Sequence, residues 1–266
     1  MGPKRRLPCW VRRPALPDKV SALYHQPLPE ELFVRLGQAL AGKRVQVFFR
    51  ADDIGKMDEE FIRMMELFGR YAMPLCLAVV PEWMSRERWQ AMDRFSTADP
   101  LWCWHQHGYA HLNYQSQGKK NEFGDVRPAE AVRRDLERGR EHLAAILGKA
   151  FCPVFTPPWN RCSSVTLQLL QELGFKAVSR SRGVQPQAEL PDLYVNVDLH
   201  TGKEANPAAA TERLVSDWDQ GIAQGRLGIM LHHQRMNERS FAFLEKLFQI
   251  LQSREGVVFC TFRELL

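Results

Sequence analysis

The feature that most constrains the fold is a regular alternation of short apolar runs and amphipathic stretches from Arg44 to the C-terminus. Eight runs have the composition of β-strands: Val45–Phe49, Leu75–Val80, Leu101–Trp104, Cys152–Phe155, Lys176–Ser179, Tyr194–Val197, Leu227–Leu231 and Val257–Cys260. Helical patterns lie between several of them, at Asp58–Tyr71, Arg127–Leu147, Ser163–Gly174 and Phe241–Leu251. Strand–helix alternation predicts a parallel sheet covered by helices. Seven or eight such strands predict an α/β fold of the (β/α) barrel type, complete or incomplete.

The chain length of 266 residues fits one large domain. Residues 1–43 are rich in proline and precede the alternation, so we expect an irregular, basic N-terminal arm over 1–43 and a barrel over 44–266. Residues 1–17 contain five basic residues and no acidic one, which accounts for the whole net charge of +5. The barrel is therefore close to neutral and does not predict nucleic-acid binding. We also expect residues 1–17 to be dispensable for folding and chemistry.

Cysteine usage and hydropathy indicate the compartment. The six cysteines form no CxxC pair, and most lie in the apolar runs, which is typical of reduced, buried thiols. No apolar stretch reaches the ~18 residues of a membrane span, and the N-terminus lacks the apolar core of a secretory signal. We expect a cytoplasmic protein without a membrane span, whose oligomeric state the sequence does not indicate.

Polar residues gather where the predicted strands end, which is where barrel enzymes carry their catalytic groups. They comprise Asp52-Asp53 after the first strand, His105, His107 and His111 around the end of the third, Thr156 to Arg161 after the fourth, Asp198 and His200 after the sixth, and His232-His233 after the seventh. Six of the eight histidines of the chain belong to this set, which a scatter over surface and core would not produce.

A two-histidine, one-carboxylate set predicts a metal site. Asp52-Asp53 alone would more often form a turn, but one carboxylate of the pair can ligate a metal while the other accepts a proton. His107 and His111, four residues apart, would share one face of a helical turn. With Asp53 they offer nitrogen and oxygen ligands that suit zinc or another divalent ion and leave positions open for water and substrate.

Two further groups allow both a structural and a functional interpretation. A histidine that ends an apolar strand, as His232 or His233 does, can be a packed core residue or a general acid. The rigid segment Pro157-Pro158-Trp159 is equally compatible with a packed loop and with one wall of a sugar-binding groove.

These motifs, in this order, resemble those of the polysaccharide deacetylases of carbohydrate esterase family four, also called the NodB homology domain. The matching pieces are R-A-D-D-I-G, H-G-Y-A-H, T-P-P-W-N, V-N-V-D-L-H and M-L-H-H, which span residues 45–233. The sequence looks most like a divergent bacterial subgroup with R-A-D-D, Q-H-G-x-x-H, E-F-G and P-P-W-N-R.

The resemblance implies a distorted seven-stranded parallel barrel and a metal-dependent hydrolase. Such an enzyme removes an acetyl group from an amino sugar or polysaccharide precursor by cleaving an amide bond. It uses one divalent metal, for which zinc is the first candidate. The implied residues are Asp53, His107 and His111 as metal ligands, Asp52 as general base, His232 (or else His233) as general acid, and Pro158, Trp159, Asn160, Arg161 and Asp198 as contacts of the carbohydrate.

The sequence departs from the family pattern at two positions. Thr156 stands where the family has the arginine that orients the base, and Arg50 or Arg161 are the candidates to replace it. Gly108 stands where the family has serine or threonine. Two alternatives therefore stay open. One is a non-catalytic carbohydrate-binding protein with a degenerate site. The other is an amidohydrolase-like metal hydrolase, suggested by His105-x-His107, although that motif should follow the first strand.

Overall fold

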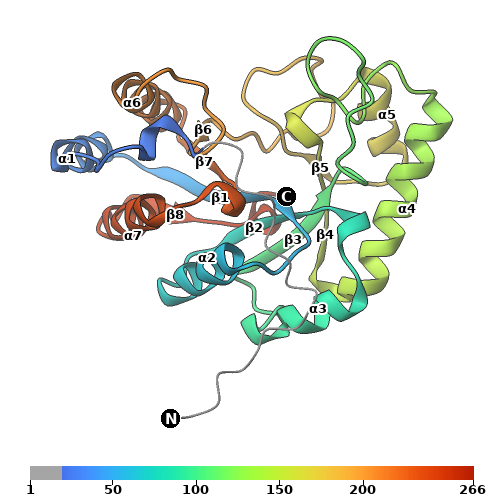
Figure 1. The fold of residues 1–266 in the computed structure, drawn as a ribbon, viewed down its shortest axis with the longest axis horizontal. Helices are drawn as coiled ribbons and strands as arrows, with labels where there is room; N and C mark the ends of the chain where they lie inside the picture. Colours follow the sequence, from blue (N-terminus) through green and yellow to red (C-terminus); the bar gives the residue numbers. More distant parts are fainter. Residues whose placement is uncertain (1–19) are drawn as a thin grey trace.

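The computed structural model describes residues 20–266 and contains one parallel β-sheet surrounded by helices (Figure 1). The sheet has the order β5-β4-β3-β2-β1-β7-β6, with β8 paired to β1 as well. The strands are β1 Val45–Ile54, β2 Leu75–Val79, β3 Trp102–His107, β4 Phe151–Thr156, β5 Ala177–Val178, β6 Val197–Asp198, β7 Arg226–Leu231 and β8 Val257–Phe259. A strand lies at or beside each predicted run, although β5 is shorter than predicted and β6 shares only Val197 with the predicted run Tyr194–Val197.

Strand β1 is the centre of the sheet. One of its edges pairs with β7, whereas the other pairs first with β8 and then, beyond Val47, with β2. The pairing with β2 is interrupted between Ala51 and Ile54, so β1 is irregular where its polar residues begin. A bulge of this kind bends a strand and re-aims its side chains.

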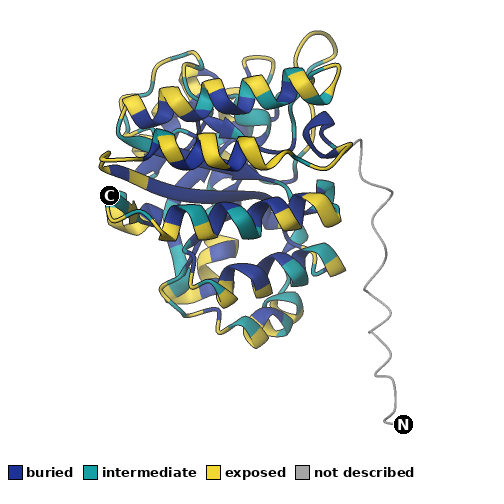
Figure 2. Cartoon of the chain, turned by 90° about the vertical axis from the view of Figure 1, so that its left-hand side faces the viewer, coloured by how far each residue is buried: buried dark blue, intermediate teal, exposed yellow. Residues whose placement is uncertain are grey.

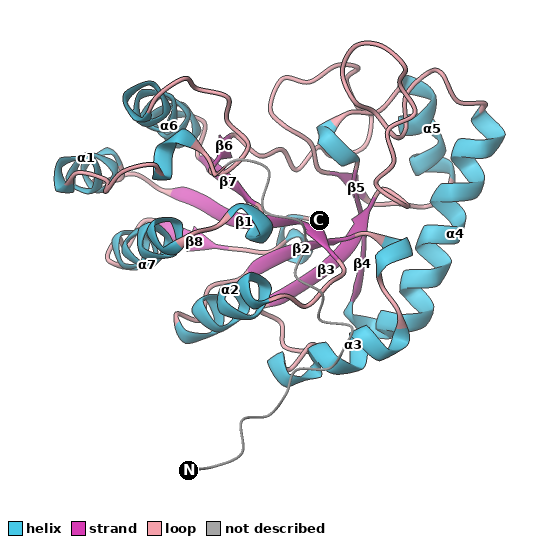
Figure 3. Cartoon of the chain, in the orientation of Figure 1, coloured by secondary structure: helices cyan, strands magenta, loops and turns pink. Residues whose placement is uncertain are grey.

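The sheet curves into a barrel that strands do not close (Figure 3). Between β5 and β6, residues 179–196 form only isolated bridges, Val178 with Asp192 and Ser181 with Val195. The predicted distorted, parallel (β/α) barrel is therefore confirmed, with seven strands along the path of the sheet and β8 beside β1.

The helices pack their apolar faces on the outside of the sheet. They are α1 Glu30–Ala39, α2 Glu59–Arg70, α3 Arg86–Met92, α4 Ala129–Leu147, α5 Ser164–Glu172, α6 Pro207–Ala223, α7 Glu238–Gln252 and α8 Phe262–Leu265. Figure 2 shows that the exposed positions of the helices on one side of the barrel lie on their outer faces. The side chains of Asp58, Ser163 and Asn237 cap α2, α5 and α7, which satisfies backbone N–H groups that a helix start leaves free.

Helix α1 corrects the expectation that residues 1–43 are irregular. Pro29 stands at its N-cap, and Leu32 and Leu36 are buried in the main core. The indole N–H of Trp218 in α6 donates to the carbonyl of Leu36 at 3.1 Å. Proline at a helix start is compatible with the helix, so the prolines mark where α1 begins. Residues 1–17, expected to be dispensable, lie outside the described residues, and the division into arm and barrel stays a prediction.

The core contains packed aromatic rings and, as predicted, free cysteine thiols. Phe49 in β1 packs edge-to-face on Phe68 and Phe248, with ring centroids 5.3 Å away in each case. The five cysteines in the described part of the chain are free and buried. In residues 20–266, no helix combines the length and hydrophobicity that crossing a bilayer requires.

Candidate metal centre

The three predicted ligands meet at the carboxyl end of the sheet. Asp53 lies near the end of β1, His107 is the last residue of β3, and His111 lies in the loop that follows. Asp53 and His111 adopt positive φ angles of 63° and 58°, which residues other than glycine rarely do and which often mark functional sites. The predicted helical turn between the histidines is wrong. Residues 108–111 form a loop, and the backbone turns at Gly108 (φ 58°) and His111 bring the two rings together.

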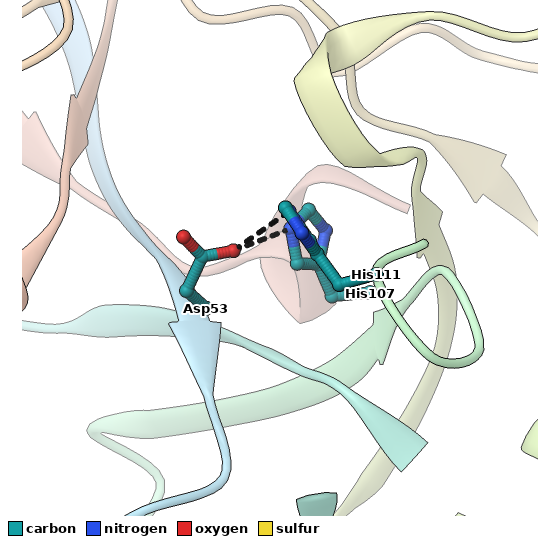
Figure 4. Close-up of side chains that lie close together, drawn as sticks. All are labelled: Asp53, His107 and His111. Atoms are coloured by element: carbon teal, nitrogen blue, oxygen red, sulfur yellow. Dashed lines mark hydrogen bonds and ion pairs between the residues drawn. The ribbon is translucent and has the colours of Figure 1, made fainter. Parts of the chain in front are cut away.

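The ligand atoms converge on one point (Figure 4). Asp53 Oδ1 lies 3.1 Å from His107 Nε2 and 3.0 Å from His111 Nε2. All three atoms lie within 4.8 Å of one another, and no other such group of His, Cys, Asp and Glu occurs in residues 20–266. Two ligands that are each ~2.1 Å from one ion are separated by similar distances. These three residues therefore fit one divalent metal.

His107 is oriented by the neighbouring strand. Its Nδ1 donates to the carbonyl oxygen of Thr156 at 2.9 Å, and the side chain is buried. A proton on Nδ1 leaves the lone pair of Nε2 free to bind a metal, the arrangement seen in many metal-binding histidines.

The carboxylate of Asp53 is held ionised. Burial opposes its ionisation, but hydrogen bonds to His107 and His111 outweigh burial and keep the pKa of Asp53 well below its ordinary value. Burial likewise lowers the pKa of His111, but the neighbouring Asp53 more than compensates, and the pKa of His111 is raised. The negative charge of Asp53 thus favours a positive charge at its neighbour His111.

Glu122 holds the loop that presents His111. Its side chain is buried, and its carboxylate accepts the backbone N–H of Ala110 at 2.8 Å and that of Tyr109 at 3.3 Å. A Cβ atom on Gly108 would lie 2.2 Å from Glu122 Oε2. Glycine at position 108 therefore makes room for this carboxylate, in place of the serine or threonine of the resembling family. In the sequence, Glu122 stands out only as part of the E-F-G motif, which by itself indicates no role for it.

Asp52 is paired with Arg50. Arg50 Nε donates to Asp52 Oδ1 and Nη2 donates to Oδ2, each at 2.8 Å, and both side chains are almost fully buried. Burial raises the pKa of Asp52, but Arg50, followed by His107 and His232, lowers it further, so the net pKa lies below its ordinary value. Asp52 is therefore an ionised carboxylate beside the candidate metal ligands.

Arg50, and not Arg161, makes the arginine contact to Asp52 that Thr156 cannot make. Arg50 is fixed in turn by Ser179 Oγ at 2.8 Å and by Asn160 Oδ1 at 2.7 Å. Arg161, the other candidate, donates to the backbone carbonyl of Lys120 at 3.2 Å. Thr156 Oγ1 lies 2.9 Å from His105 Nε2, so this pair occupies space inside the barrel beside the site.

The structure separates the two histidines after β7. His232 Nε2 lies 4.0 Å from Asp53 Oδ2. His233 Nε2 instead lies 3.6 Å from Asp58 Oδ1, in the residue that caps α2, and the His233 ring packs on Phe61. Only His232 faces the candidate metal ligands. Burial lowers the pKa of His232, and Asp53 and Asp52 partly offset this effect.

The other predicted contact residues have different surroundings. The Trp159 ring lies 4.5 Å from that of His111, whereas Pro158 is buried against Gly108. Asn160 binds Arg50. The carboxylate of Asp198 accepts the backbone N–H of His200 at 2.9 Å and takes no part in the ligand cluster. Trp83, whose ring centroid lies 5.7 Å from that of His111, is a further aromatic residue of the site that the motifs did not indicate.

Comparison with known proteins gives the fold. No family model and no curated protein matches the sequence. Among solved structures, a candidate polysaccharide deacetylase from Mycobacterium smegmatis is 17% identical with a TM-score of 0.60, over 84% of this chain and 89% of that one. A family 4 acetyl xylan esterase from Clostridium thermocellum, in complex with a cobalt ion, is 14% identical with a TM-score of 0.56, over 83% and 89%.

A mutant of a carbohydrate esterase family four pseudoenzyme from Bacillus anthracis is also similar. It is 13% identical with a TM-score of 0.54, over 84% of this chain and 67% of that one. The resemblance to this family that the motifs predicted is thus confirmed in the fold. Identities this low do not carry the activity over, and both esterases and a pseudoenzyme share the fold.

Proposed function

We propose that the protein is a metal-dependent hydrolase that removes an acetyl group from the nitrogen of an amino sugar in a saccharide. The observation that carries this proposal is the convergence of Asp53, His107 and His111 beside a separate, ionised carboxylate, Asp52. Three protein ligands leave positions open for a reactant. A site that only stabilised the fold would not need a second carboxylate held next to the ligands.

Each group of the chain has a role that its surroundings support. When bound, the divalent metal, for which zinc is the first candidate, would polarise the acetyl carbonyl and acidify an attacking water. Asp52, ionised and clamped by Arg50, accepts the proton of that water. His232 reaches the site from β7 and donates a proton to the departing nitrogen.

A degenerate carbohydrate-binding protein is the second candidate, because a pseudoenzyme has this fold. Two observations favour the enzyme. The ligand set is complete, and Arg50 supplies the contact to Asp52 that Thr156 cannot make. The amidohydrolase-like alternative has less support, because His105 binds Thr156 and lies outside the ligand cluster. A cytoplasmic location stays a prediction.

The experiment is elemental analysis of the purified protein, followed by measurement of acetate released from a panel of N- and O-acetylated sugars. We expect one divalent ion per chain in the wild type and none in the His107→Ala/His111→Ala variant. His25→Ala, which removes an exposed histidine, should keep the metal. Full metal content in the double variant would refute the site, and metal binding without any acetate release would favour the degenerate protein.

A further inference from the structure

Two tryptophan side chains border the candidate ligand His111. Trp83 lies at the end of the short helix Pro81–Trp83 after β2, and Trp159 lies in the loop after β4. Their ring centroids are 5.7 and 4.5 Å from that of His111, and both rings are half-buried. Since β2 and β4 lie on either side of β3, the loops of both neighbouring strands bring an aromatic ring to the ligand.

The ammonium group of a lysine lies near each of these indole rings. The Nζ atom of Lys56 lies 5.4 Å from the centroid of Trp83, and that of Lys120 lies 5.9 Å from the centroid of Trp159. An ammonium group this close to an indole is attracted by the ring, so both exposed cations stay near the rim of the site.

The backbone keeps the first pair together. A Cβ atom on Gly55 would lie 2.5 Å from the Cβ atom of Trp83, so the segment that carries Lys56 passes directly against Trp83. The guanidinium group of Arg88 donates to the carbonyl oxygens of both Gly55 and Trp83. The second pair is tied in a similar way, because Arg161 donates to the carbonyl oxygen of Lys120.

The cations of this rim have no carboxylate to neutralise them. Lys56, Lys120 and Arg161 form no ion pair with any carboxylate of residues 20–266. In the centre, Asp52 is paired with Arg50, and a divalent metal would compensate Asp53. Glu122, the buried carboxylate near His111, is engaged by the backbone N–H groups of Tyr109 and Ala110, so the exposed rim around His111 is aromatic and carries two lysines outside any ion pair.

We propose that this site binds an acidic saccharide, in which a carboxylate lies on the sugar next to the acetylated one. The two indole rings offer apolar faces for sugar rings, and the carboxylate forms an ion pair with Lys56 or Lys120. Complementary charge of this kind selects among ligands of similar shape. The proposal names the substrate class of the proposed function and rests on it, but it concerns binding, which can be measured without turnover.

The test compares two saccharides that differ only where one has carboxylates and the other has alcohols. Isothermal titration calorimetry measures the affinity for a hyaluronan tetrasaccharide, which alternates N-acetylglucosamine with a uronic acid, and for the same tetrasaccharide with its carboxylates reduced to alcohols. The protein is the full chain with Asp52→Asn, which should slow turnover by roughly 10²- to 10⁴-fold. We expect the acidic ligand to bind about tenfold more tightly, as one or two partly exposed ion pairs would provide. The preference should shrink in high salt.

Lysine variants assign the preference to the rim. Lys56→Gln/Lys120→Gln should abolish it, and Lys119→Gln, which removes an exposed lysine adjacent in sequence, should leave it intact. Equal affinity for both ligands, undetectable binding of both, or a preference that survives in the double lysine variant would overturn the proposal. A wild-type protein that shows the preference but releases acetate from no sugar would instead contradict the proposed function.

Discussion

Arg50 contacts Asp52 in the way that the resemblance expects of an arginine at position 156, which is far from Arg50 in the sequence. Side chains at i and i+2 of a strand point to the same side of the sheet, so an arginine two positions before the carboxylate can reach both of its oxygens. Thr156 can then be small, and its hydroxyl binds His105. The departure from the family motif therefore removes no contact that Asp52 needs.

The two adjacent aspartates should respond differently to the same substitution. Asp52→Asn should keep the metal, because Asp52 lies outside the ligand set, and should lower kcat by roughly 10²- to 10⁴-fold, the usual contribution of a general base. Asp53→Asn should lose the metal, since it removes the anionic ligand. Elemental analysis and acetate release measure both effects. Loss of metal in Asp52→Asn would mean that the two roles are exchanged or shared.

His232 and His233 form a second matched pair. His232→Ala should slow hydrolysis of an N-acetyl sugar by roughly 10²- to 10⁴-fold, because the amine leaves only with a proton. It should slow an activated acetyl ester far less, because that leaving group needs no proton. His233→Ala should change folding stability through its contact with Asp58 but keep the ratio of the two rates. If His232→Ala slows amide and ester equally, the assignment of the acid is wrong.

At the scale of elements, the loop after β3 depends on Glu122. Glu122→Gln keeps the size of the side chain but replaces one carboxylate oxygen by a donor, which faces the N–H groups of Tyr109 or Ala110. Disturbing a residue that supports a ligand typically weakens metal binding by about 10- to 100-fold. We expect a loss in this range for Co²⁺, measured by titration of its visible absorption.

The control for this loop variant is Asn121→Ala. Asn121 precedes Glu122, and its side chain accepts the backbone N–H of Phe123, so this change alters the same segment but keeps the carboxylate that binds Tyr109 and Ala110. Unchanged Co²⁺ affinity in Glu122→Gln would show that the backbone alone holds His111 in place.

The elements that repeat a pattern could be predicted from the sequence. Strands such as β1 and β7 are apolar runs of β-prone residues, and α2 shows a clear apolar stripe. Helix α1 could not be predicted in this way, because the prolines before it suggested irregular structure although Pro29 only precedes the helix.

That the three candidate ligands lie together could be predicted as well, but the geometry that brings them together could not. Asp53, His107 and His111 lie at or just after the ends of strands, so the barrel rule places them together. The turn between the histidines depends on positive φ angles and on Glu122, which lies eleven positions after His111 in the sequence. Trp83 belongs to a different loop, and only the tertiary structure brings it to His111.

At the scale of the whole molecule, buried histidines lie in both halves of the open barrel. His105 in β3 is fully buried against Phe262, and burial, with a contribution from Arg50, lowers its pKa to about 3. His200, after β6, is fully buried against Tyr24, and burial, followed by the charge of His232, lowers its pKa to about 3 as well. Both residues are therefore neutral in the folded protein well below the ordinary pKa of histidine.

These two histidines should make the protein sensitive to mild acid. The unfolded chain protonates each histidine near its ordinary pKa of ~6.5, whereas the folded chain does so only near 3, so between these values the unfolded state binds more protons. Their stabilising effect is therefore complete above pH ~6.5 and is lost as the pH falls towards 3. At pH 5, each histidine should cost about 2 kcal/mol of the free energy of unfolding relative to pH 7.

Urea unfolding at pH 7 and pH 5 measures this loss, and variants separate its sources. Asp52, Asp53 and Asp58 have lowered pKa values, so they stay ionised in both states over this range and add little to the difference. The raised pKa of His111 acts in the opposite direction and the lowered pKa of His232 in the same direction, which makes the comparison of variants more informative than the wild-type value. His200→Gln and His105→Gln should each reduce the difference between pH 7 and pH 5 by about 2 kcal/mol, while His25→Gln, at an exposed position, should leave it unchanged. If the first two variants lose as much stability on acidification as the wild type, the folded protein accommodates protons on His105 and His200, and the acid sensitivity must arise elsewhere.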